Sequence, residues 1–132
     1  EGNIVSHNQL QLKSLLVETA AEIVPLAKDA DVVGIDEVQF FDDNIITTAK
    51  DLAANGKRVI IAGLDTDYRG VPFGPMPGIM CEADYLDKLQ AICIVCGNPA
   101  SYTQRLTKEA AQVVIGETDI YEARCRHCFE AP

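Results

Sequence analysis

The chain has 132 residues, of which 48% are apolar and 23% are charged, which is enough apolar material for one folded unit with a core. Twenty acidic residues against eleven basic ones give a formal net charge of −9. This charge disfavours binding to a nucleic-acid backbone or to an anionic membrane surface, because both need a basic face on the protein. No apolar run is long enough for a transmembrane helix, and the sequence begins without a charged and apolar leader. We therefore expect a cytoplasmic protein that binds neither nucleic acid nor membranes.

The first elements alternate between strand and helix patterns. Residues 1–10 are polar and predict irregular structure, and residues 10–17 alternate partly, as a strand does. Residues 19–30 have an apolar helical face that Pro25 interrupts. Residues 31–36, Asp-Val-Val-Gly-Ile-Asp, are typical of a buried parallel strand that ends in functional carboxylates.

The next segment predicts a helix followed by a second buried strand. Residues 43–55 form the helix, with Asp42 or Asp43 as its cap and Gly56 as its stop. Residues 58–62, Arg-Val-Ile-Ile-Ala, form the strand. A strand–helix–strand unit of this kind implies a right-handed parallel crossover, which is typical of α/β folds.

The pattern changes after this unit. Residues 63–78 contain many glycines and prolines and predict a loop, which a short helix to about residue 83 follows. Residues 88–94, 101–106 and 112–115 predict short strands. We therefore expect an α/β domain over residues 1–90 and a small β domain over residues 91–132.

Two C-x-x-C pairs stand out in the second part. Cys93 with Cys96, and Cys125 with Cys128, have the spacing of a tetrahedral four-cysteine zinc site, and Gly97 suits the tight turn after the first pair. Four protein ligands leave no open position, so such a zinc ion is structural. Two disulfides, a redox-active pair and inert thiols remain alternatives; disulfides need an oxidising compartment, and a redox pair explains only two of the four cysteines.

Two residues near these pairs receive no ligand role. Cys81 is expected to be a small buried apolar residue. His127 lies between two cysteines and is expected to be a bystander, because four thiolates already complete the site.

The apolar run that ends in Asp36 and Glu37 resembles a Walker B strand. In that arrangement the first carboxylate holds Mg²⁺ and the second acts as a general base on an attacking oxygen. The alternative is that both acids simply end a strand and stay solvated. A phosphate-binding loop of the form G-x-x-x-x-G-K-[ST] does not occur in the sequence.

Seven motifs follow one another in a specific order along the chain. The motifs are residues 34–41 (Gly-Ile-Asp-Glu-Val-Gln-Phe-Phe), 62–65 (Ala-Gly-Leu-Asp), 68–74 (Tyr-Arg-Gly-Val-Pro-Phe-Gly), 93–96 with the first cysteine pair, 102–106 (Tyr-Thr-Gln-Arg-Leu), 114–116 (Val-Ile-Gly) and 121–128 with the second cysteine pair. In that order they closely resemble the zinc-containing, type II thymidine kinases over nearly the whole chain, apart from the family's N-terminal P-loop portion.

The resemblance implies a RecA-like P-loop NTPase fold with a parallel sheet, plus a zinc-clipped β subdomain that carries a lasso loop. It implies transfer of the γ-phosphate from Mg²⁺-bound ATP to the 5′-hydroxyl of thymidine. Glu37 then matches the catalytic base and Asp36 the Mg²⁺-associated carboxylate, with Val38 and Gln39 in the same nucleotide-binding turn.

Other positions match the family's thymidine site, and the resemblance also implies a homotetramer. In the family, the lasso contacts the thymine edge through its backbone and the sugar through its tyrosine, and the zinc site anchors the lasso. The matching positions are Phe40, Leu64, Tyr68 and Phe73 as pocket walls, and Gln112, Val113, Val114, Ile115, Gly116 and Tyr121 as the lasso. A non-catalytic zinc-ribbon binding module and an inactive kinase-derived fragment remain alternatives.

Overall fold

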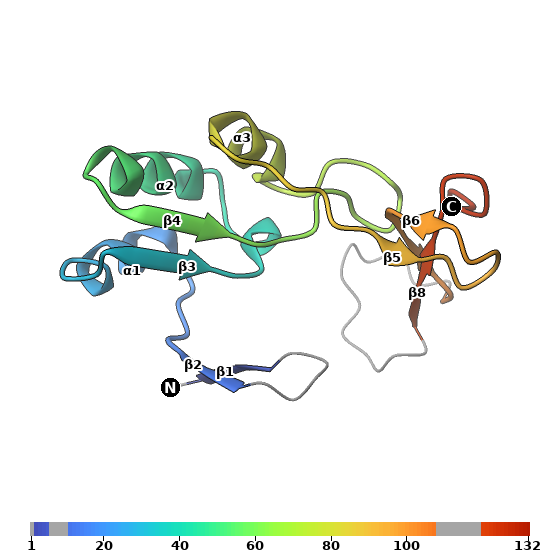
Figure 1. Cartoon of the computed structure of the whole chain (residues 1–132), viewed down its shortest axis with the longest axis horizontal. Helices are drawn as coiled ribbons and strands as arrows, with labels where there is room; N and C mark the ends of the chain where they lie inside the picture. The colour runs from blue at the N-terminus through green and yellow to red at the C-terminus, as the bar shows by residue number, and fades with distance from the viewer. Residues whose placement is uncertain (1, 6–10, 108–119) are drawn as a thin grey trace.

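The computed structural model describes residues 2–5, 11–107 and 120–132. Two groups of elements follow one another along the molecule (Figure 1). The first group contains β1 (Gly2–Val5), β2 (Gln11–Ser14), α1 (Ala20–Leu26), β3 (Val32–Ile35), a 3-10 turn (Val38–Phe40), α2 (Asn44–Ala54), β4 (Arg58–Ile61) and α3 (Met76–Glu82). The second contains β5 (Ala91–Ile92), β6 (Pro99–Ala100), β7 (Tyr102–Arg105) and β8 (Tyr121–Arg124).

The parallel pair of β3 and β4 organises the first group. Val32 pairs with Arg58 and Ile35 with Ile61, so the two strands run in register and end together. Helix α2 connects them, which confirms the predicted strand–helix–strand unit. The described residues contribute two parallel strands to this sheet, which is the part of the expected α/β fold that the structure confirms.

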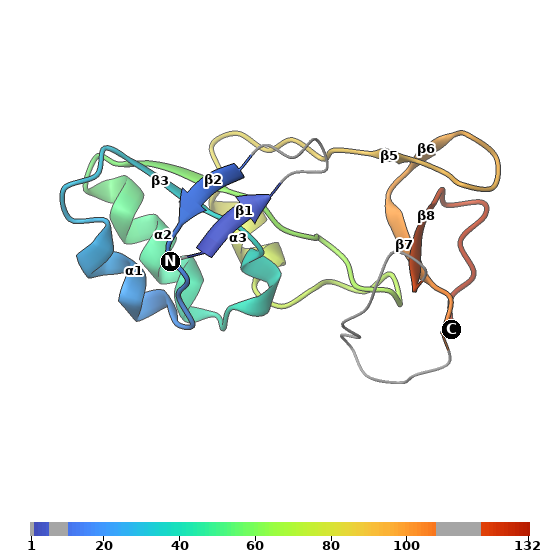
Figure 2. The ribbon, with the colours of Figure 1, turned by 90° about the horizontal axis from the view of Figure 1, so that it is seen from below.

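Helices α1 and α2 cover one face of this sheet, as Figure 2 shows. Alternate strand residues point toward the helices, and Ile35 packs there with Ile23, Ile45 and Leu52 in a buried apolar core. The periodicity of 3.6 on the helices and of two on the strands brings these side chains to one interface. Burial of this interface is the main source of stability in this half of the molecule.

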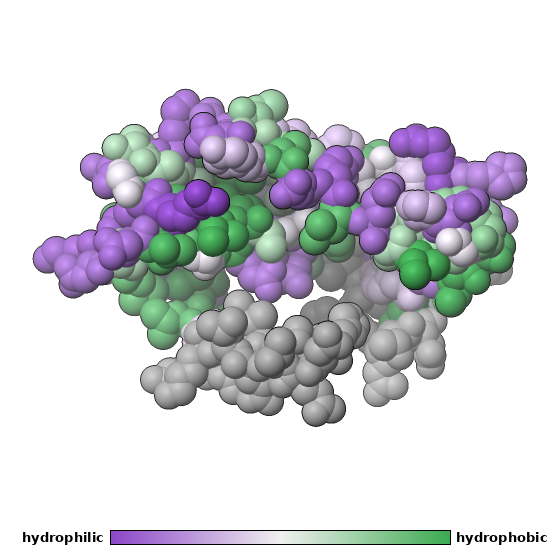
Figure 3. Space-filling view, in the orientation of Figure 1, coloured by the Kyte–Doolittle hydropathy of each residue, from purple (hydrophilic) through white to green (hydrophobic). Residues whose placement is uncertain are grey.

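In the part of the chain that the structure describes, the opposite face of the sheet is exposed. Val32 is 56% exposed and Ile60 is 54% exposed, and apolar side chains gather over β3 and β4 in Figure 3. Parallel sheets are normally covered on both faces. The described residues therefore supply one of the two layers that such a sheet requires.

Several predicted boundaries change in the structure. Helix α1 ends at Leu26, so it stops soon after Pro25. Helix α2 ends as predicted, with Gly56 at a φ of +82°. Its N-cap is Asp43, whose side chain makes no capping hydrogen bond, and the Asn44 N–H donates to the Asp42 carboxylate at 2.9 Å. Residues 2–5, expected to be irregular, form β1, which pairs with β2 in an antiparallel hairpin.

The second group consists of two short antiparallel pairs. Strand β5 pairs with β6, and β7 pairs with β8 over four residues. The strand predicted over residues 88–94 shortens to Ala91–Ile92, and β8 was not predicted. The strand expected over residues 112–115 lies outside the described residues.

Cys81 is exposed, so the expectation that it would be buried was wrong. It lies near the end of α3, on the outer side of that helix.

Among the described residues, no helix has the length and apolar character that crossing a bilayer requires.

The two faces of the β3–β4 sheet predict different responses to truncation. Ile45 has no exposed surface, so Ile45→Ala leaves a cavity between α2 and the sheet and should cost about 3 kcal/mol of unfolding free energy. Ile60→Ala, on the bare face, should cost less than about 1 kcal/mol. Urea unfolding followed by circular dichroism measures both values, and equal losses would contradict the description of one covered face and one bare face.

Candidate active site and metal centre

The carboxyl ends of β3 and β4 are tied together by backbone hydrogen bonds. The N–H of Ala62 donates to the carbonyl of Ile35 at 2.9 Å, and the N–H of Val38 donates back to the carbonyl of Ala62 at 3.1 Å. Because of these bonds, the turn after β3 lies directly against the segment that leaves β4. This is the edge of a parallel sheet at which ligands commonly bind.

Asp36 and Glu37 occupy the turn after β3, and both are exposed. Glu37 has a φ of +55°, a left-handed conformation that is uncommon for residues other than glycine, and its N–H donates to the Asp36 carboxylate at 2.9 Å. Backbone strain of this kind concentrates at functional sites. In this turn, the side chains of Asp36 and Glu37 no longer have to point to opposite faces of the sheet, as successive residues of a strand do. A Walker B pair requires this, because both of its carboxylates face the phosphates.

Gln39 joins this turn to the β4 side. Its side-chain Nε2 donates to Glu37 Oε2, and its Oε1 accepts the backbone N–H of Leu64 at 3.1 Å. Gln39 is 3% exposed, so its amide bridges the two segments from a buried position. The other residue of the predicted nucleotide-binding turn, Val38, is fully buried, and its N–H bonds to Ala62.

Two glycines allow the chain to approach Gln39 closely. A Cβ at Gly63 would lie 2.7 Å from Gln39 Oε1, and a Cβ at Gly74 would lie 2.5 Å from the Gln39 carbonyl oxygen. Gly74 also has a positive φ of +49°. These two positions accept only glycine without a shift of Gln39 or of the loop around it.

Apolar side chains lie next to the carboxylates. Phe40 and Phe73 meet edge to face, with ring centroids 5.6 Å apart, and Phe73 is buried whereas Phe40 is 56% exposed. Leu64 is also exposed. The structure thus places Phe40 and Leu64 where a ligand can reach them, with Phe73 as the buried support of Phe40.

Asp67 fixes the loop that carries Tyr68. Its carboxylate is completely buried and accepts hydrogen bonds from the Arg69 backbone and, in a fork, from the Arg69 guanidinium at 2.9 and 2.6 Å. The hydrogen bond and charge of Asp67 raise the pKa of Arg69 above its ordinary value. Arg69 is therefore engaged within its own loop. The sequence analysis missed Asp67, because a buried acid within a Gly- and Pro-rich loop has no pattern of its own.

Arg105 links that loop to the second group of strands. Its guanidinium lies 3.5 Å from the ring centroid of Tyr68 and 5.3 Å from that of Tyr121, and it donates to the Tyr121 hydroxyl at 2.9 Å. Arg105 is buried, which strengthens such cation–π contacts. The structure thus brings together Tyr68 and Tyr121, two tyrosines predicted as substrate contacts. The sequence analysis included Arg105 in the motif of residues 102–106 but assigned it no role.

A second link between the two groups uses stacked rings. Tyr102 and Phe129 stack with centroids 4.6 Å apart, and a Cβ at Gly70 would lie 3.3 Å from the Phe129 ring. Gly70 has a φ of +73°. The loop after β4 therefore packs against the strands beside the cysteine cluster. The remaining predicted lasso positions, residues 112–116, lie outside the described residues.

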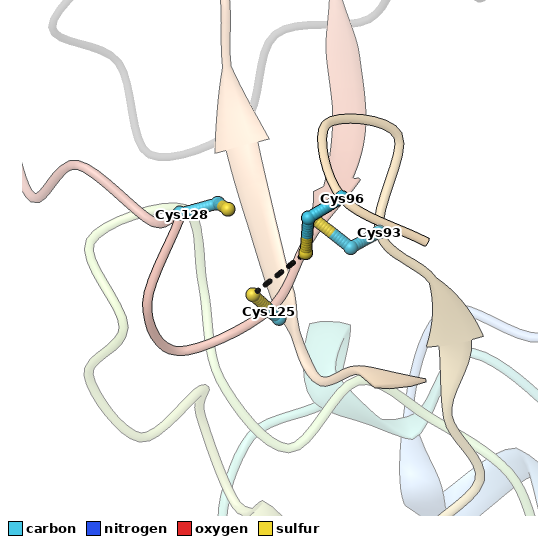
Figure 4. A group of neighbouring side chains, drawn as sticks. All are labelled: Cys93, Cys96, Cys125 and Cys128. Atoms are coloured by element: carbon cyan, nitrogen blue, oxygen red, sulfur yellow. Dashed lines mark hydrogen bonds between the residues drawn. The ribbon is translucent and has the colours of Figure 1, made fainter. Parts of the chain in front are cut away.

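The four cysteines of the two C-x-x-C pairs converge, as Figure 4 shows. All four sulfur atoms lie within 4.8 Å of one another, and Cys96 Sγ and Cys125 Sγ are 3.6 Å apart. Each pair sits in a tight turn: the Gly97 N–H donates to the Cys93 carbonyl at 2.9 Å, and the Cys128 N–H donates to the Cys125 carbonyl at 3.1 Å. A backbone hydrogen bond from Ile94 to Ala123, 3.0 Å long, holds the two turns together.

The surroundings of the sulfurs shift the pKa values of the cysteines in opposite directions. Burial raises the pKa of the Cys93 thiol, but backbone N–H groups of Cys125, Cys96 and Val95 directed at its sulfur lower that pKa to about 6. The Cys128 N–H similarly lowers the pKa of Cys125. The thiol of Cys128 donates a hydrogen bond to Cys125, which raises the pKa of Cys128 to about 12.

This cluster fits a zinc site. Zinc–sulfur bonds of about 2.3 Å in a tetrahedron place the sulfurs roughly 3.8 Å apart, so the observed spacing requires only a small contraction around the ion. The pKa values of Cys93 and Cys125 are both lowered, and a metal ion would stabilise the thiolate form of all four ligands. The same four residues hold the ends of β5 and β8, so the metal would clip these strands together.

Comparisons with known proteins support the family resemblance. A family model described as thymidine kinase matches residues 1–129. A thymidine kinase of Rhodothermus sp. (strain ITI 518) is 53% identical over 132 residues, which is 100% of this chain and 62% of that protein. Thymidine kinases of Bacteroides fragilis (strain YCH46) and Bacteroides thetaiotaomicron are each 48% identical, over 98% of this chain and 65% of their own length. The chain belongs to the thymidine kinase family, and it spans less than two thirds of the length of these curated relatives.

The metal site predicts a sharp difference between two cysteine substitutions. Cys125→Ser removes a buried ligand, so zinc content should fall to near zero and the β5–β8 region should become sensitive to protease. Cys81→Ser changes an exposed thiol outside the cluster and should keep one zinc ion per chain. Elemental analysis of the purified proteins and limited proteolysis measure both effects. Full zinc retention in Cys125→Ser would exclude the four-cysteine site.

Proposed function

We propose that this chain is the part of a thymidine kinase that binds thymidine and activates its 5′-hydroxyl. The reaction transfers the γ-phosphate of ATP to that hydroxyl and yields thymidine monophosphate and ADP. The hydroxyl proton passes to a carboxylate of this chain. The phosphate-binding loop that cradles the triphosphate belongs to a segment outside these 132 residues.

The observation that carries this proposal is the carboxylate turn after β3. Glu37 lies at the joined ends of β3 and β4, beside the accessible side chains of Phe40 and Leu64. A sugar hydroxyl is a weak nucleophile, so a positioned general base and an adjoining apolar pocket are what its phosphorylation requires. We assign the general base to Glu37.

Asp36 is the residue of this chain that would associate with Mg²⁺. It is exposed at the same strand end, and carboxylates are ligands that Mg²⁺ accepts in nucleotide sites. When bound there, Mg²⁺ would supply positive charge that offsets the charge of the triphosphate. Val38 and Gln39 complete the turn from buried positions.

The thymidine pocket combines both groups of strands. Phe40 and Leu64 contribute accessible apolar surface, Phe73 supports Phe40, and Tyr68 stands on the loop that Asp67 fixes. Tyr121 reaches the same place through Arg105. The family resemblance adds backbone contacts to the thymine ring from Gln112, Val113, Val114, Ile115 and Gly116.

The zinc site then has a mechanical role. Residues 107–120 leave from β7 and return into β8, and β8 ends at the cysteine cluster. A four-cysteine zinc site would therefore hold β8, the strand that follows the segment which the family resemblance identifies as the lasso over the nucleoside. We extend the proposal to a structural zinc ion, and to an α/β domain over residues 1–90 with a zinc-binding lasso domain over residues 91–132.

The remaining features of the proposal concern the complete protein. The bare face of β3 and β4 suits a wider parallel sheet of the P-loop NTPase type, because such sheets are covered on both faces. The resemblance supports a homotetramer. A reduced four-thiolate site and the acidic charge favour a cytoplasmic protein that binds neither nucleic acid nor membranes.

The proposal predicts a specific effect of Glu37→Gln in the complete kinase. This variant keeps the size of the side chain but cannot accept the hydroxyl proton, so kcat for thymidine phosphorylation should fall about 10²- to 10⁴-fold. Its KM for thymidine should change little, because the pocket walls remain. Coupled detection of ADP measures both constants.

The matched control is Glu82→Gln, which alters an exposed carboxylate on α3 that pairs with Lys50. This variant should keep the full rate, because its ion pair lies at the surface. Equal losses in both variants would contradict a base role for Glu37. An absence of thymidine-dependent ADP release in the unaltered protein would favour a non-catalytic zinc-ribbon module or an inactive kinase-derived fragment.

A further inference from the structure

Gln39 has a distinctive position among the polar side chains of the described site. We infer that Gln39 is a positioning residue whose side-chain amide holds the Glu37 carboxylate and the Leu64 backbone in one fixed relation, so that the base and the pocket wall are oriented together. This role differs from the direct nucleotide contact that the family resemblance implies for the same turn. It deepens the proposed function and rests on Glu37 as the base.

The two ends of the Gln39 amide are assigned by their partners. The backbone group of Leu64 that faces the amide is its N–H, so the facing end of the amide must be the acceptor, Oε1, and the two atoms are 3.1 Å apart. The Nε2 group then faces Glu37 and donates to Oε2. Because the two partners demand opposite ends of the amide, a flipped amide would lose both hydrogen bonds.

The site leaves little room for Gln39 to move. The residue is 3% exposed, and the glycines at positions 63 and 74 let the backbone pass where any Cβ would collide with it. An amide held at both ends in a buried place keeps a single orientation. The second Nε2 hydrogen and the second lone pair of Oε1 are the sites left for another partner, and the burial of Gln39 limits the access of a nucleotide to them.

The contact with Glu37 suits a general base. A carboxylate has about four acceptor positions on its two oxygens, so a donor on Oε2 leaves capacity on Oε1 for a substrate hydroxyl. Hydrogen bonds to an ionised carboxylate are strong and directional, and they restrict rotation of the Glu37 side chain. Misplacement of a catalytic group by about 1 Å can cost about 100-fold in rate.

Three variants separate positioning from direct binding in the complete kinase. Gln39→Met has a similar size and removes both hydrogen bonds. Gln39→Glu keeps an acceptor for Leu64 but places a second carboxylate against Glu37, where the two groups share a proton and the base is lost. Gly63→Ala keeps the Gln39 side chain itself but displaces its amide. The control is Gln90→Met, which alters an exposed glutamine that donates to Ser101.

Positioning predicts a loss in kcat without a loss in ATP binding. We expect Gln39→Met and Gly63→Ala to lower kcat about 10- to 100-fold. Gln39→Glu should lower kcat about 10²- to 10⁴-fold, as loss of the base does, and all three should change KM for ATP less than about twofold. Gln39→Met should also raise KM for thymidine, whereas Gln39→Glu should not, because it still accepts the Leu64 N–H. Gln90→Met should match the unaltered enzyme, and unchanged zinc content and thermal midpoint identify variants that fold correctly.

A double-substitution cycle distinguishes action through Glu37 from independent action. In the Glu37→Gln background, Gln39→Met should lower the residual kcat no further, because its effect depends on the base. An equal loss in both backgrounds, or a rise in KM for ATP with unchanged kcat, would overturn the positioning role and favour a direct nucleotide contact.

Hydrogen exchange tests the geometry without any activity. The Nε2 hydrogens of Gln39 should exchange with solvent more slowly than those of Gln90, and Glu37→Ala should speed their exchange. Rapid exchange in the unaltered protein would overturn the inference even if the protein phosphorylates thymidine. If exchange is slow but the protein has no kinase activity, the contact between Gln39 and Glu37 is supported and only the proposed function is rejected.

Discussion

The parallel pairing of β3 with β4 is the constraint on which the site depends. Because the strands run in register and end together, the turn that contains Asp36 and Glu37 meets the segment that begins at Ala62. The core under α1 and α2 fixes the position of this junction, and the buried Gln39 amide then joins its two sides. The orientation of the candidate base is therefore a consequence of sheet pairing together with one buried side chain.

The cysteine cluster imposes a second constraint at a distance from this junction. Four sulfurs at the ends of β5 and β8 fit one tetrahedral ion, which would hold the strands that flank residues 107–120. Arg105 carries the connection toward the first group, since it lies between the rings of Tyr68 and Tyr121. The cysteine cluster and the candidate thymidine site are thus linked through a short series of contacts between side chains.

The sequence predicted the features that local patterns encode. Apolar runs located β3 and β4, Gly56 located the end of α2, and the C-x-x-C spacing located the four ligands of the cluster. Features that depend on distant contacts were missed. Strand β8 alternates over only four residues, which is too short a pattern to predict a strand, and it pairs with β7. The place of Arg105 depends on rings contributed by two other segments. Cys81 was expected to be buried from the general behaviour of cysteine, whereas its position on α3 exposes it. The bridging role of Gln39 likewise depends on Leu64, which is distant in sequence.

A crystal structure of the complete kinase with thymidine bound tests the central claim most directly, because it locates the hydroxyl that is to be phosphorylated. The account predicts that the 5′-hydroxyl lies within about 2.6–3.2 Å of a Glu37 carboxylate oxygen, with the Gln39 amide still bridging Glu37 and Leu64. A hydroxyl that faces another group, or a Gln39 amide that has turned to the nucleotide, would contradict the account.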